Sequence, residues 1–332
     1  MQDTDESNAK PSILTEKLFL VLKWIFVLIL GIILVRTFQQ KQQNFDSLIK
    51  AFSKIFISKN LLKLCFVFLL IFVNWACEAR KWQILTNKFE KLSFMDAYQS
   101  VLVGLTLGFI TPANLGDFAG RVFHLNKINR QEAIGTIILG NGIQFYITLI
   151  FGILSYLIIW SENILIFDKI VFVVLIFSFF LGIFIFLKRN KIQIFLNQFA
   201  WIKRLEIYVK ALTAFENKTF VKVFIWTILR FLTYSLQFVI MLQIFQIKVE
   251  FIDLWAISCL VLLFKTLIPQ INFLSDLGIR EISALHFFSF YSVNISSVII
   301  ATFALWIINI LLPVLLGSIF FLKIKNLNKS SQ

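Results

Sequence analysis

The sequence predicts an all-α, polytopic integral membrane protein with about eight transmembrane helices. Hydrophobic residues make up 59% of the 332 residues and charged residues only 15%, whereas a soluble domain is roughly half apolar and a quarter charged. The apolar residues are also gathered into long runs, such as 18–35 and 299–322. Runs of about 18 or more apolar residues are typical of transmembrane helices.

We expect a single membrane domain over 18–322, between polar tails at 1–17 and 323–332. The first span, 18–36, is interpreted as a retained anchor, because no small-residue cleavage site follows its apolar run. Residues 44–60 fit an amphipathic helix lying in the membrane interface. The other expected spans are 61–79, 96–111, 134–160, 165–187, 220–245, 251–268 and 297–322.

The net charge of +14 would suggest nucleic-acid binding in a soluble protein. In this chain, a cytoplasmic bias of basic residues and attraction to anionic lipids explain it better. The basic connection 188–219 is expected to form surface helices on the cytoplasmic side. Eight alternating spans place 36–60 on that side too, but they place the basic segment 80–91 and the C-terminal tail on the other side. A segment that crosses only half of the membrane would resolve the conflict.

Two polar motifs, each opened by a proline, interrupt the apolar sequence. The first is TPANLGDFAGR at 111–121 and the second is PQINFLSDLGIRE at 269–281. In both, an aspartate precedes an arginine by four residues, which places the pair on one face of a helix. The shared pattern suggests two repeat halves, about 18–187 and 220–322, with half-crossing segments near 111–125 and 269–290. The alternative is that both motifs are ordinary exposed loops, in which proline and glycine stop the helices.

The charged residues of both motifs are expected to meet at one central polar site, because irregular backbone inside a membrane is tolerated only against protein or in a wet cavity. The candidate residues for binding a lipid headgroup are Arg121, Arg280, Arg230, Asp117, Asp276, Glu281 and Asn114. The candidate structural residues of the motifs are Pro112, Gly116, Gly120, Pro269 and Gly278.

Other polar residues inside the expected spans have competing explanations. Arg230 lies near the middle of a span and suits a phosphate, which guanidinium binds in bidentate fashion, but an internal salt bridge would also explain it. Lys265 lies near a span end, where its ammonium can reach the interface. Asn74 and Glu78 lie four residues apart on one span and can be explained by hydrogen bonds between helices.

The motifs resemble those of the transmembrane part of the lysylphosphatidylglycerol synthase family, also described as flippase-like membrane proteins. Residues 112–117, with Arg121 behind them, are similar to the family's PGRxGE box, although Asn114 stands in place of its arginine. Residues 278–281 match the G-[IV]-R-E part of a second box. The soluble aminoacyl-transfer domain of full-length synthases has no counterpart in these 332 residues. The resemblance implies a protein of the bacterial inner membrane that binds or translocates a phospholipid or a polyprenyl-linked lipid.

No catalytic motif accompanies this pattern. The two histidines, His124 and His286, have no metal-binding spacing, and no phosphate-binding loop or nucleophile elbow occurs. We therefore expect no metal and no cofactor, and the sequence argues against an enzyme. Two alternatives stay open: a membrane-embedded lipid or glycosyl transferase, and an accessory subunit that partners a lipid- or glycan-modifying enzyme.

Overall fold

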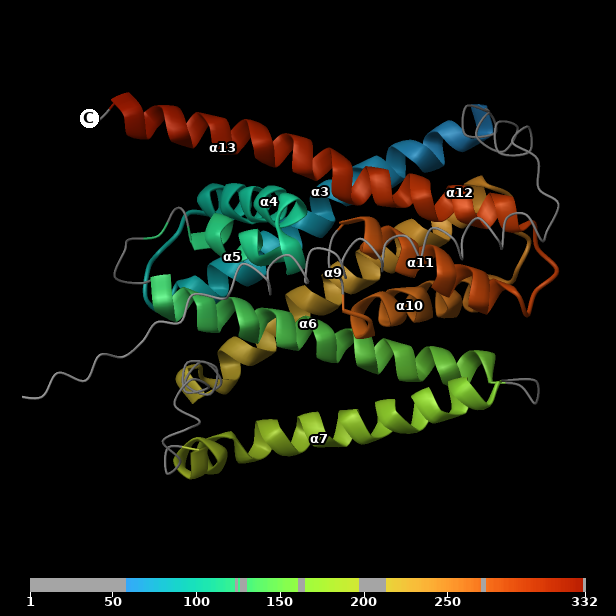
Figure 1. The fold of residues 1–332 in the computed structure, drawn as a ribbon, viewed down its shortest axis with the longest axis horizontal. Helices are drawn as coiled ribbons and strands as arrows, with labels where there is room; N and C mark the ends of the chain where they lie inside the picture. The colour runs from blue at the N-terminus through green and yellow to red at the C-terminus, as the bar shows by residue number, and fades with distance from the viewer. Residues whose placement is uncertain are drawn as a thin grey trace, which may run out of the picture.

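A computed structural model describes residues 58–122, 125, 130–160, 165–196, 213–269 and 273–330 of the chain (Figure 1). The ordered elements within these residues are all helical, which confirms the all-α class. The expected span 18–36, nearly all of the interfacial segment 44–60, most of the connection 188–219 and His124 lie outside the described residues.

Within the described part of the chain, five stretches are long and apolar enough to cross a membrane, which confirms the polytopic class. Four are single helices; the fifth joins α12 and α13 through a π-helical turn, η6. Even 28 residues of α-helix extend about 42 Å, more than the roughly 30 Å of a hydrocarbon core. The elements are α3 (Ser58–Thr86), α6 (Arg130–Ile159), α7 (Ile166–Leu196), α9 (Asn217–Ile244), α12 (Ile295–Trp306), η6 (Ile307–Leu311) and α13 (Leu312–Ser330).

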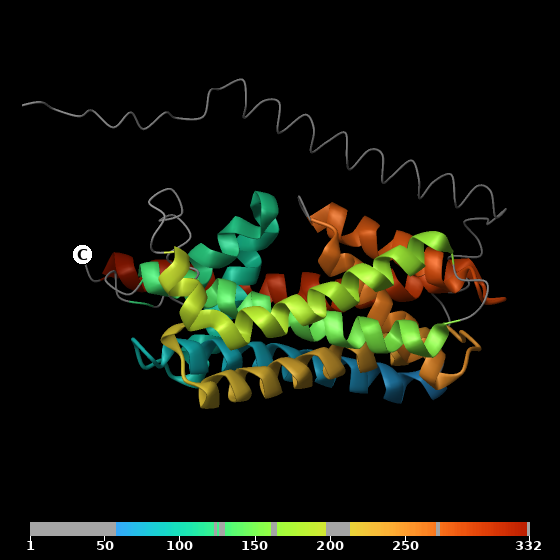
Figure 2. The same ribbon diagram turned by 90° about the horizontal axis from the view of Figure 1, so that it is seen from below.

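The expected spans 96–111 and 251–268 are each the first arm of a helical hairpin. Helix α4 (Phe94–Ile110) turns through the short 3-10 helix η2 (Pro112–Asn114) into α5 (Leu115–Arg121). Helix α10 (Phe251–Leu267) packs against α11 (Phe273–Phe288) in the same way. The two hairpins rise from opposite ends of the molecule, and their tips lie toward its middle (Figures 1 and 2). The half-crossing segments expected near 111–125 and 269–290 therefore correspond to the turns and second arms of these hairpins.

The order long helix, hairpin, long helix occurs twice, and the two copies run in opposite directions (Figure 1). Hydrogen bonds at both ends of the α3–α9 pair confirm this antiparallel arrangement. The side-chain amide of Asn60 donates a hydrogen bond to the carbonyl of Ile244, and the ammonium group of Lys88 donates one to the carbonyl of Ala214. The repeated order covers 58–159 and 217–330. The first copy leaves out α7, which lies beside the bundle, so it ends before the predicted half 18–187 does, and residues 18–57 of that half lie outside the described residues. The second copy contains the predicted half 220–322.

The hairpins bring the basic segments to one end of the molecule, here called the basic end. Because α5 returns to the end from which α4 starts, the 87–93 loop, Arg130, the end of α7 and the end of α13 share that end (Figure 1). This arrangement removes the conflict between segments 80–91, 188–219 and the C-terminal tail. Helix α3 begins at the opposite end, next to the end of α9, and the basic residues expected in loop 36–60 lie almost entirely outside the described residues.

The core lies between α3, α4, α6, α9 and α10, whose contacting apolar side chains are almost completely buried. Helix α7 differs, since only 6% of the residues in its most apolar stretch are buried by the rest of the protein. Lipid is the natural cover for such a helix in a membrane. The interior of the bundle is thus formed mainly by the two repeated units.

Candidate functional site

The first motif forms the tight turn between α4 and α5. Pro112 follows the end of α4, where its missing N–H does not interrupt the helix. Ala113 and Asn114 both have positive φ, 50° and 56°, which reverses the chain. Thr111 closes the turn: its hydroxyl donates to the carbonyl of Leu107 at 2.8 Å and accepts from the N–H of Gly116 at 2.7 Å.

Small residues let the two arms of this hairpin touch through their backbones. A Cβ atom added to Gly120 would collide with the backbone of Gly104, and one added to Gly116 would collide with the carbonyl of Leu107. Gly104 and Gly108 on α4, and Gly116 and Gly120 on α5, each form the G-x-x-x-G spacing known to bring membrane helices close. This spacing is visible in the sequence and is the signal that could have indicated the close packing of α4 and α5. The close approach holds Asp117 and Arg121 against the bundle.

Glu78 on α3 is the centre of a buried ion-pair network, here called the Glu78 cluster. Its side chain is fully buried, and its two carboxylate oxygens contact three cations. Oε1 lies 2.7 Å from Nη1 of Arg121, and Oε2 lies 2.7 Å from Nζ of Lys81 and 2.5 Å from Nη1 of Arg230. Glu78 thus joins the first motif to α9, 152 residues further along the chain. This ion pair is the internal salt bridge considered for Arg230.

The pairing of Asp117 with Arg121 follows the predicted spacing of four residues. Nε of Arg121 donates to Oδ1 of Asp117 at 2.8 Å and lies 3.0 Å from Oδ2. Arg230 also lies 3.4 Å from Oε1 of Gln144 on α6 and sits over the ring of Trp75, 5.3 Å from its centre. A buried charge without a partner is very costly, so these contacts explain how the bundle tolerates them.

The second motif forms a separate network around Asp276, here called the Asp276 cluster. Oδ2 of Asp276 lies 3.2 Å from Nη2 of Arg280 and accepts a hydrogen bond from the indole of Trp306 at 3.1 Å. Lys265 on α10 lies 3.4 Å from Oδ1. Lys265 therefore points to an interior partner, and the expectation that it simply reaches the interface is wrong.

The two clusters meet on α9 without touching each other directly. Arg280 donates a hydrogen bond to the hydroxyl of Tyr234, which lies one helical turn from Arg230. Within the described part of the chain, no ion pair links the aspartate or arginine of one motif to those of the other. The structure thus shows two clusters on consecutive turns of one helix, where the sequence suggested one shared cluster.

The other candidate residues lie around these clusters. Glu281 is 3% exposed and accepts a hydrogen bond from Thr302 at 2.5 Å through Oε1, while Oε2 is buried without a partner. Asn114 is exposed at the hairpin turn and makes no side-chain cap bond. The remaining motif residues are exposed prolines, Pro112 and Pro269, and buried glycines, Gly116, Gly120 and Gly278.

Solvent exposure separates the cations into two groups. The side chains of Arg121 and Arg280 are only 9% and 2% exposed, and carboxylates hold both. Those of Arg230 and Lys265 are 22% and 26% exposed. The accessible cations of the two clusters are therefore Arg230, which the sequence singled out, and Lys265, which it did not.

A third polar group lies at the end opposite to the basic end. His286 on α11 lies 3.1 Å from Asp168 on α7, whose carboxylate also accepts a hydrogen bond from Tyr156 at 3.1 Å. Among the described residues, no three His, Cys, Asp or Glu side chains gather in a way that could hold a metal ion. The arrangement as a whole provides buried charge and hydrogen bonds within an apolar bundle.

Comparison with known proteins agrees with this architecture. The family model described as "Lysylphosphatidylglycerol synthase TM region" matches residues 13–317, nearly the whole chain. No curated protein matches the chain. Both motifs and both clusters fall within the matched range. The chain therefore belongs to the lysylphosphatidylglycerol synthase transmembrane-region family.

Proposed function

We propose that the protein is flippase-like and binds the anionic headgroup of a lipid between Arg230 and Lys265, inside the membrane. The observation that carries the proposal is the surplus of positive charge in the two clusters. Among the described residues, the ion pairs of these clusters involve five cations and three carboxylates. The cations are Lys81, Arg121, Arg230, Lys265 and Arg280, and the carboxylates are Glu78, Asp117 and Asp276.

Even with Glu281 added, the cations outnumber the carboxyl groups. An uncompensated cation in the middle of a membrane is costly, by about 2.5–3.5 kcal/mol on insertion scales. Bundles keep such charges where they serve a substrate or an ion path. A bound anion would supply the missing negative charge, which makes the interior of this bundle a binding site for anions.

The position of the two accessible cations supports the same conclusion. Arg230 and Lys265 lie on neighbouring helices, α9 and α10, which pack against each other, and their like charges repel. Each is paired on its buried side with a carboxylate, Glu78 or Asp276, and keeps part of its side chain accessible. A phosphate between them would relieve the repulsion, and guanidinium can bind it through two hydrogen bonds.

The buried motif residues would then position the accessible cations. Arg121, which Asp117 holds, shares Glu78 with Arg230, so this pair helps to fix the direction in which Arg230 points. Arg280 shares Asp276 with Lys265 and also holds Tyr234. This division of roles differs from the expectation that Arg121 and Arg280 bind the headgroup themselves. Glu281 is buried and directly follows Arg280 in the sequence, and it belongs to the same group of supporting residues.

The opposite directions of the two repeated units support translocation in addition to binding. Carriers built from inverted repeats expose a central site alternately to each side, by moving one unit against the other. Here the two hairpins come from opposite ends, and α9 connects their clusters (Figure 2). The substrate would be a phospholipid or a polyprenyl-linked lipid in the bacterial inner membrane. An accessory role beside a lipid- or glycan-modifying enzyme is the second candidate.

Reconstitution of the purified protein into vesicles tests the proposal. The vesicles contain phosphatidylglycerol with a fluorescent acyl chain, and dithionite reports how much of it crosses the bilayer. We expect protein-dependent transfer that Arg230→Gln and Lys265→Gln both reduce, while Arg189→Gln, at the exposed basic end, does not. Transfer that needs no protein, or that all three variants support equally, would contradict the proposal. If the purified protein alone binds phosphatidylglycerol but does not transfer it across the bilayer, the accessory role beside a second enzyme would be favoured.

A further inference from the structure

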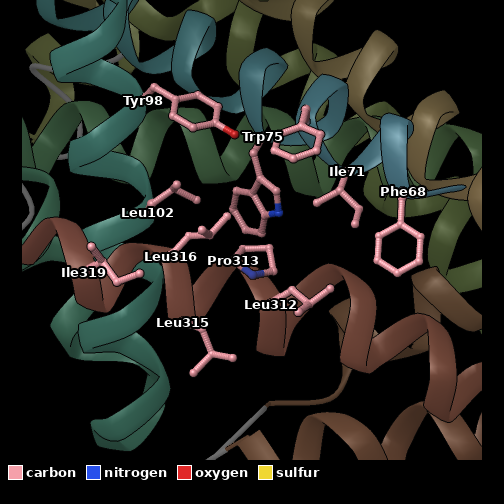
Figure 3. A pocket seen from close by; sticks show the side chains of 11 residues that line it. Phe68, Ile71, Trp75, Tyr98, Leu102, Leu312, Pro313, Leu315, Leu316 and Ile319 are labelled. Atoms are coloured by element: carbon pink, nitrogen blue, oxygen red, sulfur yellow. The ribbon is translucent and has the colours of Figure 1, made fainter. Parts of the chain in front are cut away.

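A lateral pocket lies next to the Glu78 cluster, on the outer side of α3. It has a volume of about 200 Å³ and is formed by α3, α4 and α13 (Figure 3). An apolar cavity of about 150 Å³ is already enough to stay dry and bind a hydrocarbon such as benzene. The lining is aliphatic and aromatic, with Tyr98 and Trp75 as its only polar-capable members. The ligand that suits these walls is a hydrocarbon.

The pocket opens sideways, toward the region that membrane lipid would occupy. Phe72 on α3 and Leu315 and Ile319 on α13 are at least half exposed, at 56%, 54% and 50%. These residues form the mouth, whereas Leu102 and Trp75 are 1% and 5% exposed and form the inner wall. A lipid chain could therefore enter from the bilayer without crossing water.

The helix that forms the outer wall is interrupted at the pocket. The π-helical turn η6 comes directly before α13, and Pro313 lines the pocket in the first turn of α13. Proline cannot donate to the carbonyl four residues earlier, so the helix must deviate there. After Pro313, two contacts fix α13 against α4. The hydroxyl of Thr106 donates a hydrogen bond to the carbonyl of Val314 at 2.9 Å, and Gly317 lies so close to α4 that an added Cβ would collide with the carbonyl of Leu102. A deviation so firmly held indicates a shaped pocket, and π-turns are frequent at functional sites.

Trp75 connects this pocket to the charged interior. Its indole lies among the other lining side chains in Figure 3, and its N–H is buried without a hydrogen-bond partner. The guanidinium of Arg230 lies over its ring. A buried donor without an acceptor is destabilising, so the site is complete only when an oxygen atom reaches the indole.

From these observations we infer that the pocket binds one acyl chain of a phospholipid, with the ester carbonyl accepting a hydrogen bond from the Trp75 indole. An ester carbonyl stands at the polar end of an acyl chain, so it can reach a donor on the inner wall while the chain fills the apolar space. A polyprenyl chain has no such carbonyl next to its hydrocarbon. This inference rests on the proposed function and narrows the substrate to a diacyl lipid.

Photo-cross-linking of the full-length protein in vesicles tests the inference. The probe is phosphatidylglycerol with a diazirine in one acyl chain, and mass spectrometry locates the labelled residues. Leu316→Trp fills the pocket, and Leu322→Trp adds the same side chain at an exposed position of α13 outside it. We expect labelling of the pocket walls in the unchanged protein and in Leu322→Trp, and its loss in Leu316→Trp. Labels spread evenly over all apolar faces, equal in both variants, would overturn the inference.

A second variant tests the hydrogen bond separately. Trp75→Phe keeps an aromatic ring for Arg230 but removes the N–H, so wall labelling should fall about three- to tenfold, as expected for one lost hydrogen bond. Unlabelled phosphatidylglycerol should compete with the probe, and polyprenyl phosphate should not. Equal competition by polyprenyl phosphate, together with unchanged labelling in Trp75→Phe, would refute an acyl-specific site. The proposed function can fail separately. If the pocket walls of the unchanged protein are labelled but Arg230→Gln transfers lipid as well as the unchanged protein does, only the proposed function is refuted.

Discussion

Arg230 and Tyr234 lie one turn apart on α9, and each contacts a different charged cluster. Arg230 reaches Glu78 on α3, and Tyr234 accepts a hydrogen bond from Arg280 on α11. One helix therefore connects two motifs that are about 160 residues apart in the chain. A movement that separates the two repeated units must change at least one of these contacts, which makes α9 the mechanical link of the bundle.

The first prediction concerns Glu78, which holds three cations. Glu78→Gln removes the charge that compensates Lys81, Arg121 and Arg230, so the free energy of unfolding should fall by about 3–5 kcal/mol. Thermal unfolding of the detergent-purified protein measures the change. Glu132→Gln, at the exposed start of α6, serves as control and should cost less than about 1 kcal/mol. A similar, small effect of both variants would show that Glu78 is not the centre of the network.

The second prediction concerns the turn between α4 and α5. Ala113 has a φ of 50°, in a region that costs an L-residue about 1–2 kcal/mol and glycine almost nothing. Ala113→Gly should therefore raise the melting temperature, although glycine gives the unfolded chain more freedom. Ala119→Gly, on the exposed face of α5, should lower it, since glycine in a helix costs about 1 kcal/mol. Destabilisation by Ala113→Gly would mean that the turn differs from the one described.

The third prediction concerns the backbone contact between α4 and α5. Gly120→Ala places a methyl group against the backbone of Gly104, which cannot move aside as a side chain can. The hairpin should open, and thermal stability should fall by the 1–3 kcal/mol typical of an overpacked core. At Gly142 on α6, a methyl group meets nothing within 4 Å, so Gly142→Ala should be neutral or stabilising. Equal tolerance of both variants would disprove the close crossing.

The fourth prediction concerns orientation. Lys91 lies in the 87–93 loop at the basic end and Lys188 lies in the last third of α7, which ends there, whereas Glu250 is the N-cap of α10, which begins at the opposite end (Figure 1). With the native cysteines replaced, an impermeant maleimide should label Glu250→Cys in intact cells, and should label Lys91→Cys and Lys188→Cys only after lysis. Opposite reactivity of Lys91→Cys and Lys188→Cys would show that α4 crosses the membrane completely. Labelling of both in intact cells would reverse the orientation.

The sequence located the apolar helices well because length and hydropathy determine them. Spans expected at 61–79, 134–160 and 220–245 lie within α3, α6 and α9, or extend only one residue past their ends. It could not distinguish α4 and α10 from full crossings, because an apolar helix of 17 residues has nearly the length of a span. The returning arms were visible only indirectly, as prolines and as basic segments on the wrong side of an alternating topology.

The candidate site was predictable in its members but not in its connections. The pairs Asp117–Arg121 and Asp276–Arg280 follow from helical spacing, and both form. Glu78 and Lys265 were explained as a hydrogen-bonding residue and an interface residue, because a local pattern cannot reveal a partner on another helix. Their roles depend on how α3, α9 and α10 pack. Which cations of the clusters stay accessible to solvent also depends on how the bundle is assembled, and the sequence could not show that these are Arg230 and Lys265.

The most direct test of the central claim is a double-mutant cycle on headgroup binding. Native mass spectrometry of the purified protein gives the affinity for phosphatidylglycerol in the unchanged protein, Arg230→Gln, Lys265→Gln and the double variant. If one phosphate contacts both side chains, each single change should weaken binding about tenfold or more. The double variant should then lose less than the two single losses combined, because the second cation binds poorly without the first. Single variants that bind phosphatidylglycerol as tightly as the unchanged protein would contradict the account.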